Sequence, residues 1–213
     1  MKFLITAGPT REPIDPVRFL SNRSSGKMGY AIAEAALADG HEVVLISGPV
    51  CISAPTGVEI VSVTTSDEMF DAVHSRLADI DVAVLCAAVA DFKPSECAPR
   101  KIKKHEGIPN ITLVPTRDIL GSLGAMSGKK FLLVGFAAET NNVEENARKK
   151  LREKHCDVVI ANDVSVPGQG FESDENELTI FIPDQNGRVF PRAEKRELAK
   201  SVIAILTELK KKR

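Results

Sequence analysis

The run from Phe3 to Ala7 (FLITA) and the segment from Arg18 to Gly29 (RFLSNRSSGKMG) decide the fold of this chain. The apolar run predicts a buried strand, and the alanine-rich run Tyr30–Ala38 predicts a helix behind the segment. A strand, a Gly/Ser loop and a helix N-terminus together present free N–H groups and a positive dipole end to an anion. Because this loop also holds two arginines and a lysine, we predict a phosphorylated ligand there.

Spacing excludes two common phosphate motifs. A P-loop requires Gly, four residues and then Gly-Lys-Ser/Thr, but here Ser21 takes the place of the first glycine and Met28 that of the hydroxyl. A dinucleotide fingerprint requires Gly-x-Gly-x-x-Gly after the first strand and an acidic residue about 20 residues later. Instead Gly8-Pro9-Thr10 follows the first strand, and Gly48-Pro49 follows the second. The sequence therefore predicts a nucleotide-type fold with a different phosphate loop.

The composition indicates one globular domain spanning residues 1–213. With 213 residues, 43% hydrophobic and 27% charged, the chain can bury a full core. The net charge of −1 gives no global attraction to nucleic acid or membranes. No apolar run approaches the roughly 20 residues of a membrane span, and Met1-Lys2 leads directly into a strand, so we expect no signal peptide.

The cysteines and histidines are scattered along the chain. Cys51, Cys86, Cys97 and Cys156 form no Cys-x-x-Cys pair, which is typical of reduced cytoplasmic thiols. We therefore expect a cytoplasmic protein with no disulfide framework and no metal site built by the protein alone.

Apolar runs alternate with helical patterns through most of the chain. Continuous β-branched runs favour a parallel sheet buried on both faces, so we predict an α/β fold with a doubly wound, Rossmann-like, mainly parallel sheet and helices on both faces. The predicted strands are 2–7, 42–47, 58–63, 81–87, 131–137 and 157–161; the predicted helices are 29–39, 66–78, 116–125 and 142–155. Ligands of such sheets bind beyond the carboxyl ends of the strands. Four polar or small-residue segments follow those ends, at 8–10, 87–91, 135–140 and 161–163.

Two regions interrupt this alternation. Residues 90–111, called the flap below, form a long segment with a basic run, and loops of this length are often lids or binding loops. Residues 177–191 predict a β-hairpin around Asp184-Gln185-Asn186-Gly187. A last helix is expected at about 192–210.

Five ordered motifs make the resemblance to a known family specific. They are Ser21–Gly26 (SNRSSG), Ala87–Asp91 (AAVAD), Lys101–Lys104 (KIKK), Gly135–Thr140 (GFAAET) and Ala161–Val164 (ANDV). With them, essentially the whole chain resembles the bacterial phosphopantothenate–cysteine ligases of coenzyme A biosynthesis.

The resemblance implies a reaction in two halves. The carboxylate of 4′-phosphopantothenate attacks the α-phosphate of CTP, giving an acyl-cytidylate and pyrophosphate; the cysteine amine then attacks the activated carbonyl and releases CMP. It also implies Mg²⁺ held largely by the triphosphate, a homodimer, and phosphopantothenoylcysteine decarboxylase as a functional partner. In many bacteria the ligase is fused behind that decarboxylase, so this chain is either a stand-alone ligase or an excised domain.

Among substrate residues, the resemblance implies that the Asn22 amide donates to the acyl-phosphate carbonyl, while Asn22 could instead cap a helix or fix a turn. Arg18 would handle substrate with its guanidinium, while its alternative is an ordinary surface arginine. The other residues expected to bind the phosphorylated substrate are Ser24, Ser25, Gly26, Lys27 and Ala88.

Among nucleotide residues, the resemblance implies that Asp91 contacts the ribose, with Ala87 and Ala88 close to the cytosine; Asp91 could instead cap the turn before Pro94. Lys101 would close over the acyl-cytidylate with the flap, which gives it a catalytic role beside Asn22 and Arg18; a solvated charge run is its alternative. Phe136 would pack on the base or ribose, or simply belong to the core.

Lys150 and Lys154 lie four residues apart on one helix face, where like charges repel, and the resemblance implies that both reach CTP phosphates. The chain departs from the family at Thr116-Arg117-Asp118-Ile119-Leu120, where family members have Asn-Pro-Asp-Ile. The expected nucleotide contacts here are Arg117, Asp118, Ile119 and Leu120, with Thr116 able to cap the helix.

Two other function classes stay open at this level. One is an NAD(P)-dependent reductase on the same fold, against which the missing fingerprint and acidic residue count. The other is a non-catalytic nucleotide-binding module, against which the flap lysines and Asn22 count.

Overall fold

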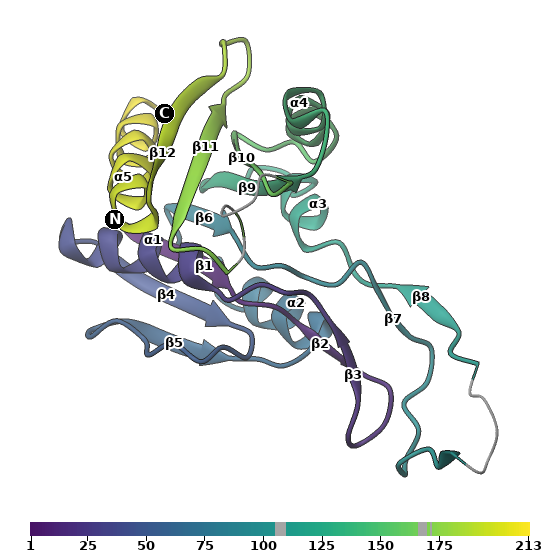
Figure 1. The fold of residues 1–213 in the computed structure, drawn as a ribbon. Coiled ribbons are helices and arrows are strands. Elements are labelled where there is room, and N and C mark those ends of the chain that lie inside the picture. The colour runs from purple at the N-terminus through teal and green to yellow at the C-terminus, as the bar shows by residue number, and fades with distance from the viewer. Residues whose placement is uncertain (105–109, 166–169, 171) are drawn as a thin grey trace.

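The structure is a computed structural model that describes residues 1–104, 110–165, 170 and 172–213. These residues form an eight-stranded sheet in the order β12-β11-β10-β9-β6-β1-β4-β5 (Figure 1). The strands are β1 (Lys2–Ala7), β4 (Glu42–Ser47), β5 (Glu59–Ser62), β6 (Val82–Leu85), β9 (Leu132–Glu139), β10 (Val158–Asp163), β11 (Glu175–Phe181) and β12 (Arg188–Glu194). The helices are α1 (Lys27–Ala38), α2 (Ser66–His74), α3 (Ile119–Gly124), α4 (Val143–Glu153) and α5 (Lys195–Lys212).

The sheet is doubly wound, as the alternation of strands and helices predicts. Strands β5, β4, β1, β6, β9 and β10 pair in parallel, while β11 and β12 add an antiparallel edge. The chain runs outward from β1 to β4 and β5 and then returns to β6 on the other side of β1. The order therefore reverses between β1 and β6, which is where such sheets bind ligands.

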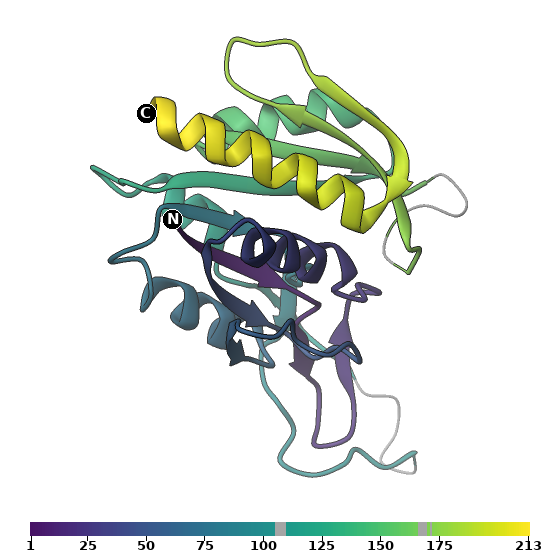
Figure 2. The same cartoon turned by 90° about the vertical axis from the view of Figure 1, so that its left-hand side faces the viewer.

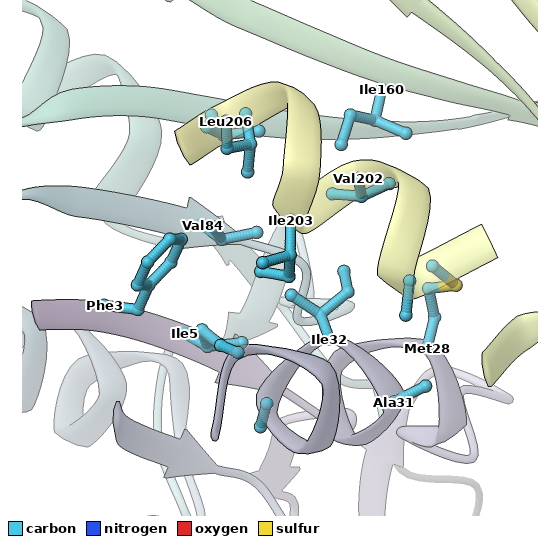
Figure 3. Packing of buried hydrophobic residues seen from close by; sticks show 14 of the residues in the cluster. Phe3, Ile5, Met28, Ala31, Ile32, Val84, Ile160, Val202, Ile203 and Leu206 are labelled. Atoms are coloured by element: carbon cyan, nitrogen blue, oxygen red, sulfur yellow. The ribbon is translucent and has the colours of Figure 1, made fainter. Parts of the chain in front are cut away.

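Two hydrophobic layers cover the two faces of the sheet. Phe3 and Ile5 of β1 point toward α1 and α5, while Leu4 points toward the layer under α2, α3 and α4. Figure 2 shows α1 and α5 on one face, and Figure 3 shows Ile203 and Leu206 of α5 packed over this core. Each fully buried side chain of this kind contributes about 1.5–3 kcal/mol, so the layers fix α1 against β1.

Two short antiparallel ribbons project from the sheet, and neither was expected from the sequence (Figure 1). One pairs β2 (Arg11–Pro13) with β3 (Phe19–Ser21), and the other pairs β7 (Phe92–Pro94) with β8 (Leu113–Pro115). Each of these strands has three residues, which is too short for the alternation of polar and apolar residues to be recognised in the sequence. The predicted flap is therefore not a plain loop, since β7 lies within it; its residues 105–109 lie outside the described residues.

Several element boundaries differ from the prediction. The hairpin of β11 and β12 is confirmed, but it extends to Glu194, so the last helix begins at Lys195 rather than near 192. The third helix begins at Ile119 rather than 116, because Asp118 is its N-cap and accepts from Gly121 N at 2.9 Å. Thr116 is not the cap; its hydroxyl donates to Ala90 O at 2.6 Å.

Candidate functional site

A cavity of about 490 Å³ opens at the carboxyl ends of the parallel strands. It gathers most of the predicted site residues from distant parts of the sequence: Asn22, Ser24, Gly26, Lys27, Ala87, Ala88, Asp91, Arg117, Asp118, Ile119, Leu120, Phe136, Lys150 and Lys154. Phe136 and Asn162 line it from neighbouring strands, as expected of polar and small-residue strand ends on one rim. Arg18, Ser25 and Lys101 do not line it.

The start of α1 forms one wall of this cavity. Gly26 is the N-cap, with φ of 78°, a left-handed conformation that favours glycine, and no side chain caps the helix. A Cβ on Gly29 would lie 2.6 Å from Ala7 Cβ, so α1 can approach β1 this closely only with glycine there. The first helical residues therefore face the cavity with N–H groups suited to an anion.

Asn22 lies between this wall and the end of β6. Its Nδ2 donates to Ala88 O at 2.9 Å, and Ala88 N in turn donates to Gly8 O at 2.9 Å. A side-chain amide carries two N–H groups, so the bond to Ala88 orients Asn22 and leaves one donor for a ligand in the cavity.

Lys150 of α4 and Lys154, the C-cap of that helix, line the opposite side, while Ala147 and Leu151 of α4 are buried. Their repulsion is already offset by protein groups: Lys150 Nζ donates to Phe136 O at 2.9 Å, and Lys154 Nζ lies 2.6 Å from Asp118 Oδ2. Burial raises the pKa of Asp118, but the bonds from Lys154 and Gly121 N outweigh it, so the pKa is lowered and the carboxylate stays charged.

Sequence reasoning missed Lys195 and Asn176, which also line the cavity and are 5% and 3% exposed. Lys195 Nζ donates to Gly170 O at 2.7 Å and to Ser173 O at 2.5 Å. Burial, with the nearby Lys27, lowers the pKa of Lys195. Lys27 Nζ itself lies 2.7 Å from Asp174 Oδ1. Lys27 holds the chain before β11 against the start of α1, and Lys195 holds it against the start of α5. This arrangement depends on tertiary structure and has no local sequence signal.

Arg18 and Lys101 lie together outside the cavity. Asp15, whose side chain is fully buried, accepts from the Arg18 guanidinium and from Ile102 N, the latter at 3.2 Å. Arg18 Nη2 also donates to Ile102 O at 2.9 Å. The Asp15–Arg18 pair therefore holds the flap beside Lys101, so Arg18 contacts the flap rather than the cavity in this structure.

Replacing Asp15 with Asn should loosen this contact and lower the melting temperature at pH 7. Hydrogen bonding from Arg18, with backbone N–H groups, holds the pKa of Asp15 far below its usual range despite burial. A lowered pKa contributes stability above the unfolded-state value of about 3.9 and loses it as pH falls through the folded value. Thermal melts should therefore show the gap between wild type and D15N shrinking below about pH 4.

The matched control for this prediction is Asp184→Asn, which makes the same change in the exposed turn between β11 and β12. Its melting temperature should follow that of wild type. A gap for D15N that stayed constant down to pH 2 would contradict the ionised contact.

The cysteine thiols differ in their surroundings. Burial raises the pKa of Cys86, on the cavity wall, and of Cys156 to about 12, whereas Cys51 and Cys97 are exposed. Because the thiolate is the reactive form, iodoacetamide at pH 8 should alkylate Cys51 and Cys97 at least about tenfold faster than Cys86. Peptide mass mapping over time measures this, and rapid labelling of Cys86 would disprove it.

Among the residues that the structure describes, no group of three or more His, Cys, Asp or Glu side chains gathers as a metal site. Within the same residues, no helix combines the length and apolar character needed to cross a bilayer.

Among curated proteins, the chain is similar to bifunctional proteins named for coenzyme A biosynthesis. The Coenzyme A biosynthesis bifunctional protein CoaBC of Vibrio vulnificus is 48% identical over 202 residues, covering 94% of this chain and 50% of that protein. CoaBC of Bacillus subtilis is 46% identical over 209 residues, covering 98% of this chain and 51% of that protein. The chain therefore spans about half the length of the curated relatives it matches.

Solved structures with a similar fold include a relative of the same kind. The crystal structure of the C-terminal domain of CoaBC has a TM-score of 0.83 at 43% identity and covers 99% of this chain and 96% of that one. A Cab2 mutant in complex with phosphopantothenate-cysteine shares the fold, with a TM-score of 0.80 at 18% identity over 99% of this chain and 86% of that one. The family described as DNA/pantothenate metabolism flavoprotein C-terminal domain matches residues 1–209, and this chain belongs to it.

Proposed function

We propose that this chain ligates 4′-phosphopantothenate to L-cysteine in coenzyme A biosynthesis, using CTP and passing through an acyl-cytidylate. The observation that carries the proposal is a single cavity with anion-binding groups on two sides. The start of α1, which no side chain caps, lies on one side with Asn22, and Lys150 and Lys154 lie on the other. The CoaBC relatives are named for coenzyme A biosynthesis, and Cab2, with the same fold, was solved with phosphopantothenate-cysteine.

The first half-reaction brings two anions together. A carboxylate oxygen of phosphopantothenate attacks the α-phosphorus of CTP, and the bond to the β-phosphate breaks to release pyrophosphate. Lys150 and Lys154 would hold the triphosphate, while Lys27 and the start of α1 would hold the phosphorylated substrate, so the protein offsets their repulsion. Ser24, which lines the cavity, would add a hydroxyl donor at this wall.

The second half-reaction needs an oxyanion donor. The cysteine nitrogen attacks the acyl carbon, loses a proton, and the bond to CMP breaks. The N–H of Asn22 would stabilise the negative charge that develops on the carbonyl oxygen. Asp91 would hold the ribose, and Phe136 with Ala87 and Ala88 would surround the cytosine.

Magnesium would be bound mainly by the triphosphate and by water. Asp91 and Asp118 are the acidic side chains among the described residues that line the cavity, and Asp118 is engaged by Lys154. This donor set fits a hydrated Mg²⁺ that arrives with the nucleotide and shields its charge.

The test is an assay of the wild-type chain with phosphopantothenate, cysteine, Mg²⁺ and either CTP or ATP. We expect CMP, pyrophosphate and phosphopantothenoylcysteine with CTP and much less product with ATP. Lack of nucleoside monophosphate and pyrophosphate with both nucleotides would overturn the ligase proposal. Oxidation of NADPH in a parallel sample would favour a reductase instead.

We also propose a homodimer and a functional link to phosphopantothenoylcysteine decarboxylase. The two ribbons carry exposed apolar side chains, including Phe19 at 47% and Phe92 at 54% exposure, which a second copy could cover. Light scattering of the purified chain should give twice the monomer mass, and a monomer at all concentrations would refute the dimer.

A further inference from the structure

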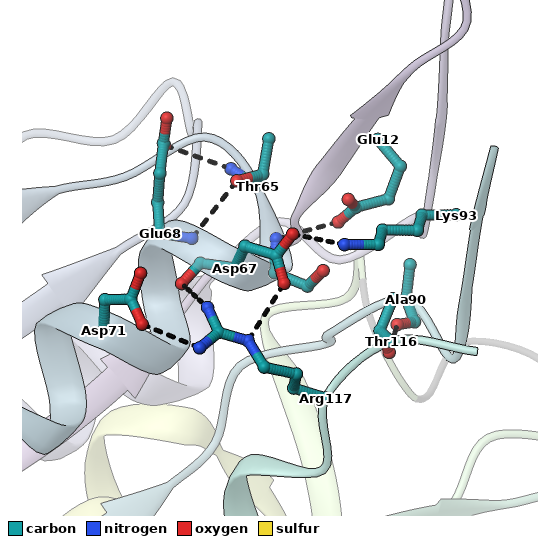
Figure 4. Close-up of polar contacts among 10 residues, drawn as sticks. Glu12, Thr65, Asp67, Glu68, Asp71, Ala90, Lys93, Thr116 and Arg117 are labelled. Atoms are coloured by element: carbon teal, nitrogen blue, oxygen red, sulfur yellow. Dashed lines mark hydrogen bonds and ion pairs between the residues drawn. The ribbon is translucent and has the colours of Figure 1, made fainter. Parts of the chain in front are cut away.

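Arg117 lines the cavity, and its guanidinium is bonded to α2. Its Nε donates to Asp67 Oδ1 at 3.0 Å, its Nη2 to Asp67 O at 2.8 Å and its Nη1 to Asp71 Oδ1 at 2.8 Å (Figure 4). The guanidinium carbon also lies 4.0 Å from the centre of the Phe70 ring. Three donated bonds and an aromatic face hold Arg117 in one orientation.

Asp67 binds a second cation from the flap. Lys93, on β7, forms an ion pair with the same carboxylate (Figure 4). The bond from Lys93 is the main reason that the pKa of Asp67 is lowered, and Arg117 adds to it against burial. The carboxylate of Asp67 therefore joins the base of the flap to the turn before α3.

The start of α2 is itself fixed. Thr65 and Glu68 form a reciprocal capping box, in which Glu68 N donates to Thr65 Oγ1 at 3.2 Å. Ser66 N donates at 2.9 Å to Glu12, a residue of β2 that is only 1% exposed. Asp67 thus projects from a helix end anchored to the first ribbon.

The turn that Arg117 holds carries the groups assigned to the nucleotide. Asp118 caps α3 and pairs with Lys154, and Thr116 N donates to Asp91 O at 2.9 Å. The bonds from Arg117 to α2 constrain this turn.

We infer that Arg117 and Asp67 are positioning residues for the nucleotide half of the site, which set Asp118 and Asp91 from α2 and tie them to the base of the flap. This rests on the proposed ligase function. It predicts that their loss impairs nucleotide binding much more than phosphopantothenate binding.

The test compares R117A and D67N with wild type in three measurements: the Kd of CTP by calorimetry, the KM of phosphopantothenate, and the melting temperature. Both variants remove hydrogen bonds between charged groups. We therefore expect the Kd of CTP to rise about tenfold and the KM of phosphopantothenate to change less than about twofold. The double variant should lose less CTP affinity than the sum of the two single losses, because the single variants share the Arg117–Asp67 contact. It should still lose more than either single variant, since Asp67 also pairs with Lys93 and Arg117 with Asp71. R117K should recover only part of the affinity, since an ammonium lacks the planar fork that makes these three bonds and the flat face that lies on Phe70.

Arg148→Ala is the matched control, since Arg148 also pairs with a carboxylate, Glu144, and lies near an aromatic ring, Phe181, but does not line the cavity. It should lose a similar amount of stability with the Kd of CTP unchanged. A CTP affinity in R117A equal to wild type, or a loss in R148A as large as in R117A, would overturn the inference. A wild-type chain that binds and uses no nucleotide would overturn the proposed function itself, and the inference with it.

Discussion

Asn22→Asp should lower turnover by about two to three orders of magnitude while the fold stays intact, the range seen when an oxyanion donor is removed. The change replaces an N–H donor with a charged acceptor of the same shape. The new carboxylate would face Ala88 O, which now accepts from Asn22 Nδ2 at 2.9 Å. It would also repel the substrate carboxylate and the oxyanion that forms from it. The steady-state rate of pyrophosphate release measures the turnover, and a melting curve shows whether the fold stays intact.

Asn186→Asp is the control for this prediction, because it adds the same charge in the exposed turn between β11 and β12. Its turnover should match that of wild type. If N22D kept wild-type activity, the role assigned to Asn22 would be wrong.

Lys101→Gln should slow the formation of the acyl-cytidylate by about 100-fold, since a positioned cation on transferring phosphoryl groups is worth several kcal/mol. Lys101 lies outside the cavity, next to Ile102, whose backbone is held by Asp15 and Arg18. It would reach the nucleotide only when the flap moves toward the cavity. The loss should therefore appear in kcat more than in the Kd of CTP.

The measurement is pyrophosphate release in the absence of cysteine, which isolates the first half-reaction. Lys104→Gln removes the same charge three residues further along the flap and should change the rate by less than about threefold, as for an exposed cation. Equal rates for K101Q and wild type in both half-reactions would refute the flap role of Lys101.

The strand ends that form the cavity are predictable from the sequence. A parallel strand buried on both faces appears as a continuous apolar run, such as Val82–Leu85, and the first small or polar residues after it mark the rim. Parallel pairing then brings Ala87, Phe136 and Asn162 to one edge.

Other parts of the site depend on contacts that no local pattern encodes. Lys195 resembles any lysine at a helix start, and only the fold brings its ammonium to Gly170 O and Ser173 O. The orientation of Arg117 likewise depends on α2, about 50 residues earlier in the chain, as the bonds to Asp67 and Asp71 show.

The close approach at Gly29 limits how this protein can be engineered. Replacing a helical glycine with alanine usually stabilises a protein by about 0.4–1 kcal/mol, because the unfolded chain loses freedom. At Gly29 the added methyl would lie 2.6 Å from Ala7 Cβ and push α1 away from β1. Selection for heat resistance and selection for turnover should therefore both retain this glycine, one to keep the core closed and the other to keep the helix start at the cavity.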